Sequence, residues 1–341
     1  MQTINQALGE FSERFMLLAA LTYTVAFIVF TLDLVKSSKR IRAVEENLAA
    51  AQEADQMALV GADRSSRPGV RAGSAGVAGD ATADDTMDYT GRRKLARIAV
   101  VLTVIAALIH AAGVISRGLA TNRVPWGNMY EFCTTGALVV VVVFLLALIR
   151  KDLRFLGTFV VGLTLVMLCA ATIGFFTPVG NVVPALQRYW LVIHVSVAVV
   201  SSALFTLTFA MSVLQLIQTS RIRRLAAGGT DRAPFMRLVP SALSLENLSY
   251  RINAVAFVMW TFTLMAGAIW AEEAWGRYWG WDVKEVWTFV IWVVFAGYLH
   301  ARATRGWTGT RAAWLCIIGY LCIVFNFTIV NIYFSGLHSY A

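Results

Sequence analysis

Eight apolar runs constrain this chain more than any other feature of its sequence. A helix needs about 20 consecutive apolar residues to cross the hydrocarbon core of a bilayer. Inside that core every backbone polar group must be hydrogen-bonded within the protein, which leaves helices or closed barrels as spanning structures. The pattern predicts an all-α fold, a polytopic integral membrane bundle of about eight transmembrane helices. The runs cover 15–35, 95–116, 133–149, 155–175, 190–217, 252–271, 286–303 and 312–334.

The composition agrees with a membrane bundle. Of the 341 residues, 58% are hydrophobic and only 14% are charged, whereas soluble proteins average about 25% charged residues. The net charge of +9 would suggest nucleic acid in a soluble protein, but here it indicates cytoplasmic loops, so no nucleic-acid partner is expected. No A-x-A-like cleavage site follows the first run, which is therefore expected to be retained as a span.

The Lys/Arg-rich segments predict the orientation. If the spans alternate, these segments all fall on one side, which should be the cytoplasm of a multi-pass plasma-membrane protein. The N- and C-termini and the tryptophan-rich segment 275–287 are then extracytoplasmic. The basic segments are 36–42, 91–94, 150–154, 221–224 and 300–311.

The stretch after the first run differs from the rest of the chain. Its beginning, AVEENLAAAQEADQM, is compatible with a short helix, and its remainder is rich in Gly, Ala, Ser and Asp and cannot bury a core. We therefore expect a first transmembrane helix at 1–36, a cytoplasmic flexible linker at 37–94 and the main membrane domain at 95–341.

The segment WGRYWGWDVKEVW, residues 275–287, holds four of the eleven tryptophans. Tryptophans gather at membrane interfaces without any ligand, so an aromatic belt with a solvated loop is one interpretation. The other is a surface for a flat, apolar and charged ligand such as a porphyrin.

Two of the four histidines are expected near this segment. His194 lies just inside the outer end of the fifth run, and His338 follows the last run, both on the outer side. Two imidazoles from opposite sides give six-coordinate haem iron, although an interfacial histidine is often only solvated. An outer haem site is therefore one hypothesis for this end.

The other two histidines lie elsewhere. His300 follows Trp287 by thirteen residues, about 20 Å along a helix, so it cannot share an iron with the outer pair. If His300 binds iron, it belongs to an inner site whose other ligand comes from His110 or from a partner protein. The depths of His110 and His300 match poorly, which favours the partner. His110 is expected to be a packed structural histidine.

The four cysteines form no CxxC or CxxCH motif. The chain therefore carries no covalent haem attachment site and no thioredoxin-like redox pair of its own. We expect the cysteines to pack as small apolar side chains.

The tryptophan segment resembles the WWD signature of the haem-handling proteins of cytochrome c maturation. The resemblance departs mildly at Val283 and Val286, where that family often has Pro and Thr. It extends over roughly 95–341 and includes VPWGNMYEF, WLVIHV, YLHARATRGW and VNIYFSGLHSY. About eight spans and a late signature resemble the CcsA/ResC-type subunit of the system II cytochrome c synthase, whose actinobacterial members are often called CcsB. The matching signature residues are Trp275, Gly276, Trp279, Trp281, Asp282, Lys284, Glu285 and Trp287.

The resemblance implies haem transport as part of a holocytochrome c synthase (haem lyase) complex. Haem b would meet His300 and a ligand from a ResB/Ccs1-type partner, then pass to His194 and His338 outside. There the CxxCH cysteines of apocytochrome c, kept reduced indirectly by a thioredoxin-like protein, would form thioethers with it. At least one of Arg277 and Lys284 is expected to meet a haem propionate. The porphyrin would be held by Trp275, Gly276, Trp279, Trp281, Asp282 and Trp287.

No nucleophile or general base for this chemistry is evident in the chain, so we expect it to shape the site. Three alternatives remain. One is haem delivery without ligation. Another is a b-type membrane electron-transfer protein, which predicts histidine pairs at matching depths, whereas only the outer pair matches. The third is a solute transporter, which predicts paired halves with broken helices, and no such symmetry is visible.

Overall fold

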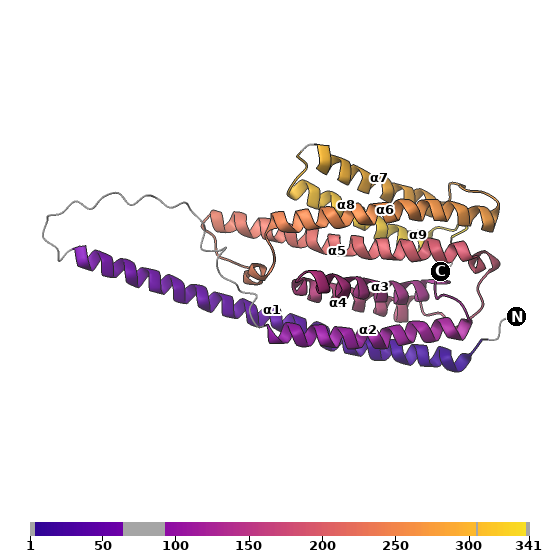
Figure 1. Cartoon of the computed structure of the whole chain (residues 1–341), viewed down its shortest axis with the longest axis horizontal. Coiled ribbons are helices and arrows are strands. Elements are labelled where there is room, and N and C mark those ends of the chain that lie inside the picture. The colour runs from indigo at the N-terminus through magenta and orange to yellow at the C-terminus, as the bar shows by residue number, and fades with distance from the viewer. Residues whose placement is uncertain (1–3, 64–92, 305, 339–341) are drawn as a thin grey trace.

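The computed structural model describes residues 4–63, 93–304 and 306–338 and is helical in all regular parts of them (Figure 1). The α-helices are α1 Gln6–Asp63, α2 Lys94–Thr121, α3 Met129–Arg150, α4 Gly157–Cys169, α5 Tyr189–Ala226, α6 Ala242–Trp275, α7 Val283–Thr304, α8 Thr310–Phe327 and α9 Ile329–Tyr333. The 3₁₀ turn Arg154–Leu156 precedes α4, and the π turn Ala170–Gly174 follows it. Two further 3₁₀ turns, Pro184–Gln187 and Pro234–Leu238, precede α5 and α6.

Eight segments in the described ranges are long and apolar enough to cross a membrane. Seven of them contain α1, α2, α3, α4, α5, α6 and α7, and the eighth, Thr310–Tyr333, joins α8 and α9. Each corresponds to one of the eight predicted runs, which confirms the expected polytopic helical membrane bundle.

The helices pack in two connected groups (Figure 1). One apolar core lies among α1, α2, α3 and α4 around Tyr23, Phe30 and Val141. Another lies among α5, α6, α7 and α8, where Phe205 stacks on Phe295 with ring centroids 3.8 Å apart. The long helix α5 packs against α3, α6 and α8 and so joins the two groups.

The first helix is longer than predicted. Residues 37–63, expected to begin a flexible linker, continue α1 as helix, and residues 64–92 lie outside the described residues. The continuation is rich in Ala, Glu and Gln, which have high helix propensity. Near the end of the apolar run, Asp33 is buried and accepts hydrogen bonds from Arg93 Nε at 2.9 Å and Ala96 N at 3.2 Å. This carboxylate fixes α1 to the first turn of α2, where backbone N–H groups lack helical partners.

One end of the bundle, called the loop end here, gathers segments 122–128, 175–188 and 276–282 (Figure 1). Asn5, near the N-terminus, lies at the same end, since its N–H donates to Ala120 O at 2.9 Å. The last described residue, His338, contacts Asp282 there. The two described ends of the chain therefore lie together, as an even number of spans requires. Which side of the membrane the loop end faces remains a prediction from the Lys/Arg pattern.

Candidate functional site

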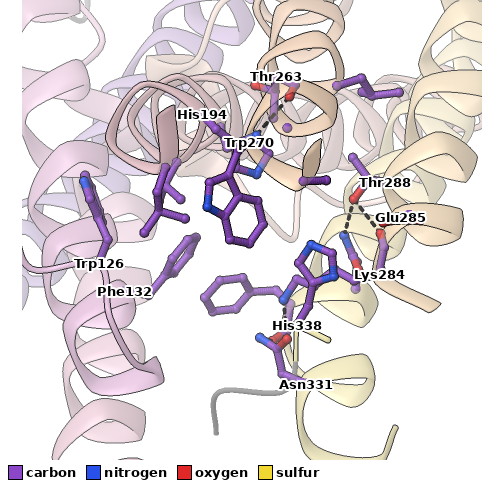
Figure 2. A pocket seen from close by; sticks show the side chains of 18 of the residues that line it. Trp126, Phe132, His194, Thr263, Trp270, Lys284, Glu285, Thr288, Asn331 and His338 are labelled. Carbon is purple, nitrogen blue, oxygen red and sulfur yellow. Dashed lines mark hydrogen bonds between the residues drawn. The ribbon is translucent and has the colours of Figure 1, made fainter. Parts of the chain in front are cut away.

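A cavity of about 190 Å³ opens at the loop end, between the two helix groups (Figure 2). Helices α3, α5, α6, α7, α8 and α9 contribute to its wall together with the 122–128 loop and the C-terminal segment. Most lining side chains are apolar, as in ligand sites generally, and a few polar groups lie among them. The aromatic part of the wall includes Trp126, Phe132, Trp260, Trp270, Trp279 and Phe327.

His194 reaches the cavity from the second turn of α5. Its Nδ1 lies 2.9 Å from the Thr263 carbonyl oxygen of α6. A carbonyl oxygen only accepts, so Nδ1 carries the proton and the Nε2 lone pair is free. Gly267 allows this placement, because a Cβ there would lie 2.8 Å from His194 Cε1. Trp270 lies nearly parallel to the imidazole at a centroid distance of 6.0 Å.

His338 reaches the same cavity from the C-terminal segment. Its Nδ1 is hydrogen-bonded to the Asp282 carboxylate, which leaves Nε2 available. The hydrogen bond from His338 holds the pKa of Asp282 below its ordinary value, so the carboxylate remains an acceptor. The imidazole packs edge-on against Trp275 and Trp270, with centroids 4.8 and 5.5 Å away.

The structure therefore brings together the two histidines that the sequence placed at the outer end. Figure 2 shows His194, Trp270 and His338 pointing toward one space, with Trp126 and Phe132 across from them. In each imidazole an oxygen orients Nδ1. This arrangement is characteristic of histidines that bind a metal through Nε2.

The tryptophan segment is not one flat surface. Trp275 ends α6 against His338, and Trp279 lines the cavity. Trp281 is 76% exposed with φ of +59°, and it contacts Trp279 edge-on. Trp287 packs on Phe325 at 4.3 Å and does not line the cavity. Gly276 caps α6 with φ of +71°, a left-handed conformation that favours glycine.

The two basic residues of the tryptophan segment also differ in whether they line the cavity. Lys284 lines the cavity and donates to Asn331 Oδ1. Arg277 lies outside the cavity wall and pairs with Glu285 at 3.4 Å.

Glu285 has a structural role that we did not predict. It is 9% exposed, and its Oε2 accepts from Gly280 N at 2.8 Å and Asp282 N at 3.1 Å. This is the geometry of a helix capping box, in which the acid three residues after the cap bonds back to the cap N–H. The D-x-x-E spacing at the start of α7 was the signal for it. Glu285 thereby fixes Asp282, and with it His338.

Glu131 organises the opposite wall. This carboxylate is fully buried and accepts from Arg117 Nε at 3.0 Å, Arg123 Nη1 at 2.7 Å and Gly127 N at 2.8 Å. Arg117 also donates to Thr177 O at 2.6 Å. One buried ion cluster thus ties the 122–128 loop and the 175–188 loop to α3. It holds the loop that carries Trp126 on the cavity wall.

His300 and His110 lie away from the cavity. His300 is exposed near the end of the unbroken helix α7, about 20 Å beyond Trp287 along its axis. His110 is fully buried in α2, where its Nδ1 lies 3.5 Å from the Tyr23 hydroxyl. His110 is therefore packed inside the bundle, as expected of a structural histidine.

The cysteines follow the expectation only in part. Cys133 and Cys316 are buried and Cys322 is half-buried, whereas Cys169 is exposed on the bundle surface. Among the described residues, no group of three or more His, Cys, Asp or Glu side chains could hold a bare metal ion.

Comparison with known proteins identifies the family of this chain. Residues 126–338 match the family described as cytochrome C assembly protein. The chain is 33% identical over 275 residues to the cytochrome c biogenesis protein CcsA of Prochlorococcus marinus, covering 71% of this chain and 84% of that protein. It is 35% identical over 275 residues to the CcsA of Synechococcus elongatus, covering 69% and 85%. It is 31% identical over 282 residues to the CcsA of Gloeobacter violaceus, covering 69% and 83%. As the tryptophan segment predicted, this chain belongs to the cytochrome C assembly protein family.

Proposed function

We propose that this chain transports haem b across the membrane and presents it at the loop-end cavity for attachment to apocytochrome c. The observation that carries the proposal is the pair His194 and His338. Both line one aromatic cavity, and in both an oxygen engages Nδ1 and leaves Nε2 for iron. Two neutral imidazoles are the usual axial ligands of low-spin b-type haem.

The rest of the cavity suits a porphyrin. Aromatic side chains pack well against its flat apolar ring. Its propionates need polar partners, and Lys284 lines the cavity. Trp126 also lines it, and its buried Nε1 has no hydrogen-bond partner among the described residues. Of the two candidate propionate partners, Lys284 is the better placed, because Arg277 does not line the cavity and is paired with Glu285.

The chain's own contribution is to position and shield haem, which supplies the reactive vinyl groups. Each CxxCH thiol of apocytochrome c adds across a vinyl C=C bond. A C–S bond forms at one carbon, and the thiol proton ends on the other. The thiol must be reduced for this step, which assigns an indirect role to a thioredoxin-like reductant.

His300 belongs to a separate inner site in this proposal. Its side chain is exposed on the surface of α7 rather than enclosed in the described bundle. A membrane subunit of ResB type packed against α7 could supply the second axial ligand there. Haem would then move from the His300 site to the loop end, on the extracytoplasmic side of the plasma membrane.

The absorption spectrum of the purified complex tests the proposal. Wild type co-expressed with its ResB-type partner is expected to show a reduced low-spin b-type spectrum. His300→Ala is expected to lower haem content only when the partner is present. A colourless wild-type complex would contradict haem binding. Bound haem without thioether formation on a co-expressed CxxCH reporter would instead indicate delivery without ligation.

Gly267→Ala tests the placement of His194. The added Cβ would lie 2.8 Å from His194 Cε1, so the ring must turn away and lose its bond to Thr263. Loss of such a supporting bond typically lowers metal affinity roughly 10–100-fold. Haem retention in detergent should fall to that extent.

Gly297→Ala is the matched control for this substitution. It lies in helix α7, and a Cβ there meets nothing within 4 Å. Both changes give the same gain in helix propensity, so a difference in haem retention reports the contact with His194. Equal retention in the two variants would remove His194 from the proposed ligand set.

A further inference from the structure

A second cavity lies at the end of the bundle opposite the loop end. Its volume is about 320 Å³, and the last turns of α5 and the segment before α6 form its wall. One side is aliphatic, from Leu216 and Ile217. The other side carries hydroxyl groups and three arginines, Arg221, Arg224 and Arg232. This combination of an apolar side and a cationic side has no part in the proposed haem chemistry.

Only one acid lies among these arginines, and it is already paired. Between 220 and 237 the chain has five arginines and a single acidic residue, Asp231. Arg221 donates to Asp231 through Nε at 3.0 Å and Nη2 at 2.8 Å. Burial opposes ionisation of Asp231, yet these bonds and the nearby positive charges hold its pKa below the ordinary value. The carboxylate is thus ionised, and it neutralises Arg221.

Arg224 and Arg232 keep their charge free for a ligand. Both line the cavity, and neither forms an ion pair with another described residue. The stem of Arg224 packs against Gly229, where a Cβ would lie 2.8 Å from Arg224 Cγ. Gly228, with φ of +73°, turns the chain to allow this approach. Arg224 therefore lines the cavity with its stem against this turn.

The position of the cavity points to a lipid. Helix α5 is one of the eight candidate spans. Its apolar run ends at residue 217, on the cavity wall, which places the cavity near the predicted membrane interface. The end of the bundle where it stops is the one predicted to be cytoplasmic. The cytoplasmic leaflet is anionic, and basic pockets between spans on this side bind phosphate headgroups.

We propose that this cavity binds the headgroup of an anionic phospholipid. Arg224 and Arg232 hold the phosphate, and Ser220 and Thr230 offer hydroxyl donors. One acyl chain lies along Leu216 and Ile217. Free inorganic phosphate shares the headgroup chemistry, but it would make no use of the aliphatic side.

Native mass spectrometry of the full chain tests the proposal. The protein in detergent is mixed with phosphatidylglycerol or phosphatidylcholine, and the retained lipid is measured. Wild type is expected to retain phosphatidylglycerol preferentially. The Arg224→Gln/Arg232→Gln variant should bind it at least roughly tenfold more weakly, since each surface cation contributes on the order of 1 kcal/mol.

The control variant is Arg223→Gln/Arg251→Gln. It removes two exposed arginines from α5 and α6 that do not line the cavity, so total charge changes equally. Retention of phosphatidylglycerol by this control, with loss in the cavity variant, supports the site. Equal loss in both variants, or equal binding of phosphatidylcholine by wild type, overturns it. Displacement of the lipid by equimolar inorganic phosphate would assign the cavity to the free anion and overturn the lipid assignment.

Discussion

Replacing His194 or His338 by Ala is expected to remove low-spin haem from the loop-end cavity. Each change takes away one of the two proposed axial nitrogens and leaves the aromatic wall intact. Loss of a supporting residue alone costs roughly 10–100-fold in metal affinity, so loss of a ligand should cost at least as much. The reduced spectrum of the purified complex should lose its b-type α band, and haem per protein should fall at least tenfold.

His110→Gln is the control for these variants. His110 is fully buried between α1 and α2 and does not line the cavity. The variant should therefore keep the wild-type spectrum, provided that yield and gel filtration show a folded protein. A wild-type spectrum in His338→Ala would show that the imidazole bound to Asp282 is not an iron ligand. The tryptophan segment would then be better explained as an interfacial belt.

Glu131→Gln is expected to cause the largest loss of stability. The carboxylate is fully buried and compensates Arg117 and Arg123 at 3.0 and 2.7 Å. Removing one partner of a buried ion pair leaves an uncompensated charge and typically costs about 3–5 kcal/mol. The free energy of unfolding, from SDS titration in mixed micelles, should fall by that amount. Because Glu131 also holds the 122–128 loop, haem retention should fall with it.

Glu10→Gln provides the comparison on an exposed pair. Glu10 and Arg14 form an i,i+4 ion pair with side chains 69% and 74% exposed. Such surface pairs contribute little, roughly 0–1 kcal/mol. An equally small effect of Glu131→Gln would mean that the buried cluster does not support the loop end.

The sequence predicted the elements that depend on local pattern. Each of the eight spans was visible because a helix must satisfy its own backbone over about 20 apolar residues. His194 and His338 were assigned to one end because alternation of spans fixes which ends share a side. The separation of His300 followed from the rise per residue of a helix. Within 37–63 only a short helix was considered, because the polar composition suggested a linker, although the Ala and Glu content favoured a continuous helix.

Several site residues were visible only once the helices were packed. Thr263 orients His194 across 69 residues of sequence, and Gly267 makes room for its ring. Nothing in the sequence marked Trp270 as a cavity residue, since a tryptophan inside an apolar run is usually a packing residue. Trp287 belongs to the signature segment, yet α7 directs it toward Phe325 instead of the cavity.

The sequence by itself determined that this is a bundle of eight spans with two histidines and a tryptophan segment at one end. The hydropathy of each segment and the number of spans can be read from the sequence alone, so neither requires three-dimensional information. Only the tertiary structure decided which face of each helix meets the cavity, and which oxygen orients each imidazole. Those contacts join residues far apart in sequence, such as His338 and Asp282, 56 positions apart. They depend on how each helix is rotated about its axis and on the angles at which helices cross. Side-chain packing sets both, and the order of the helices in the sequence does not.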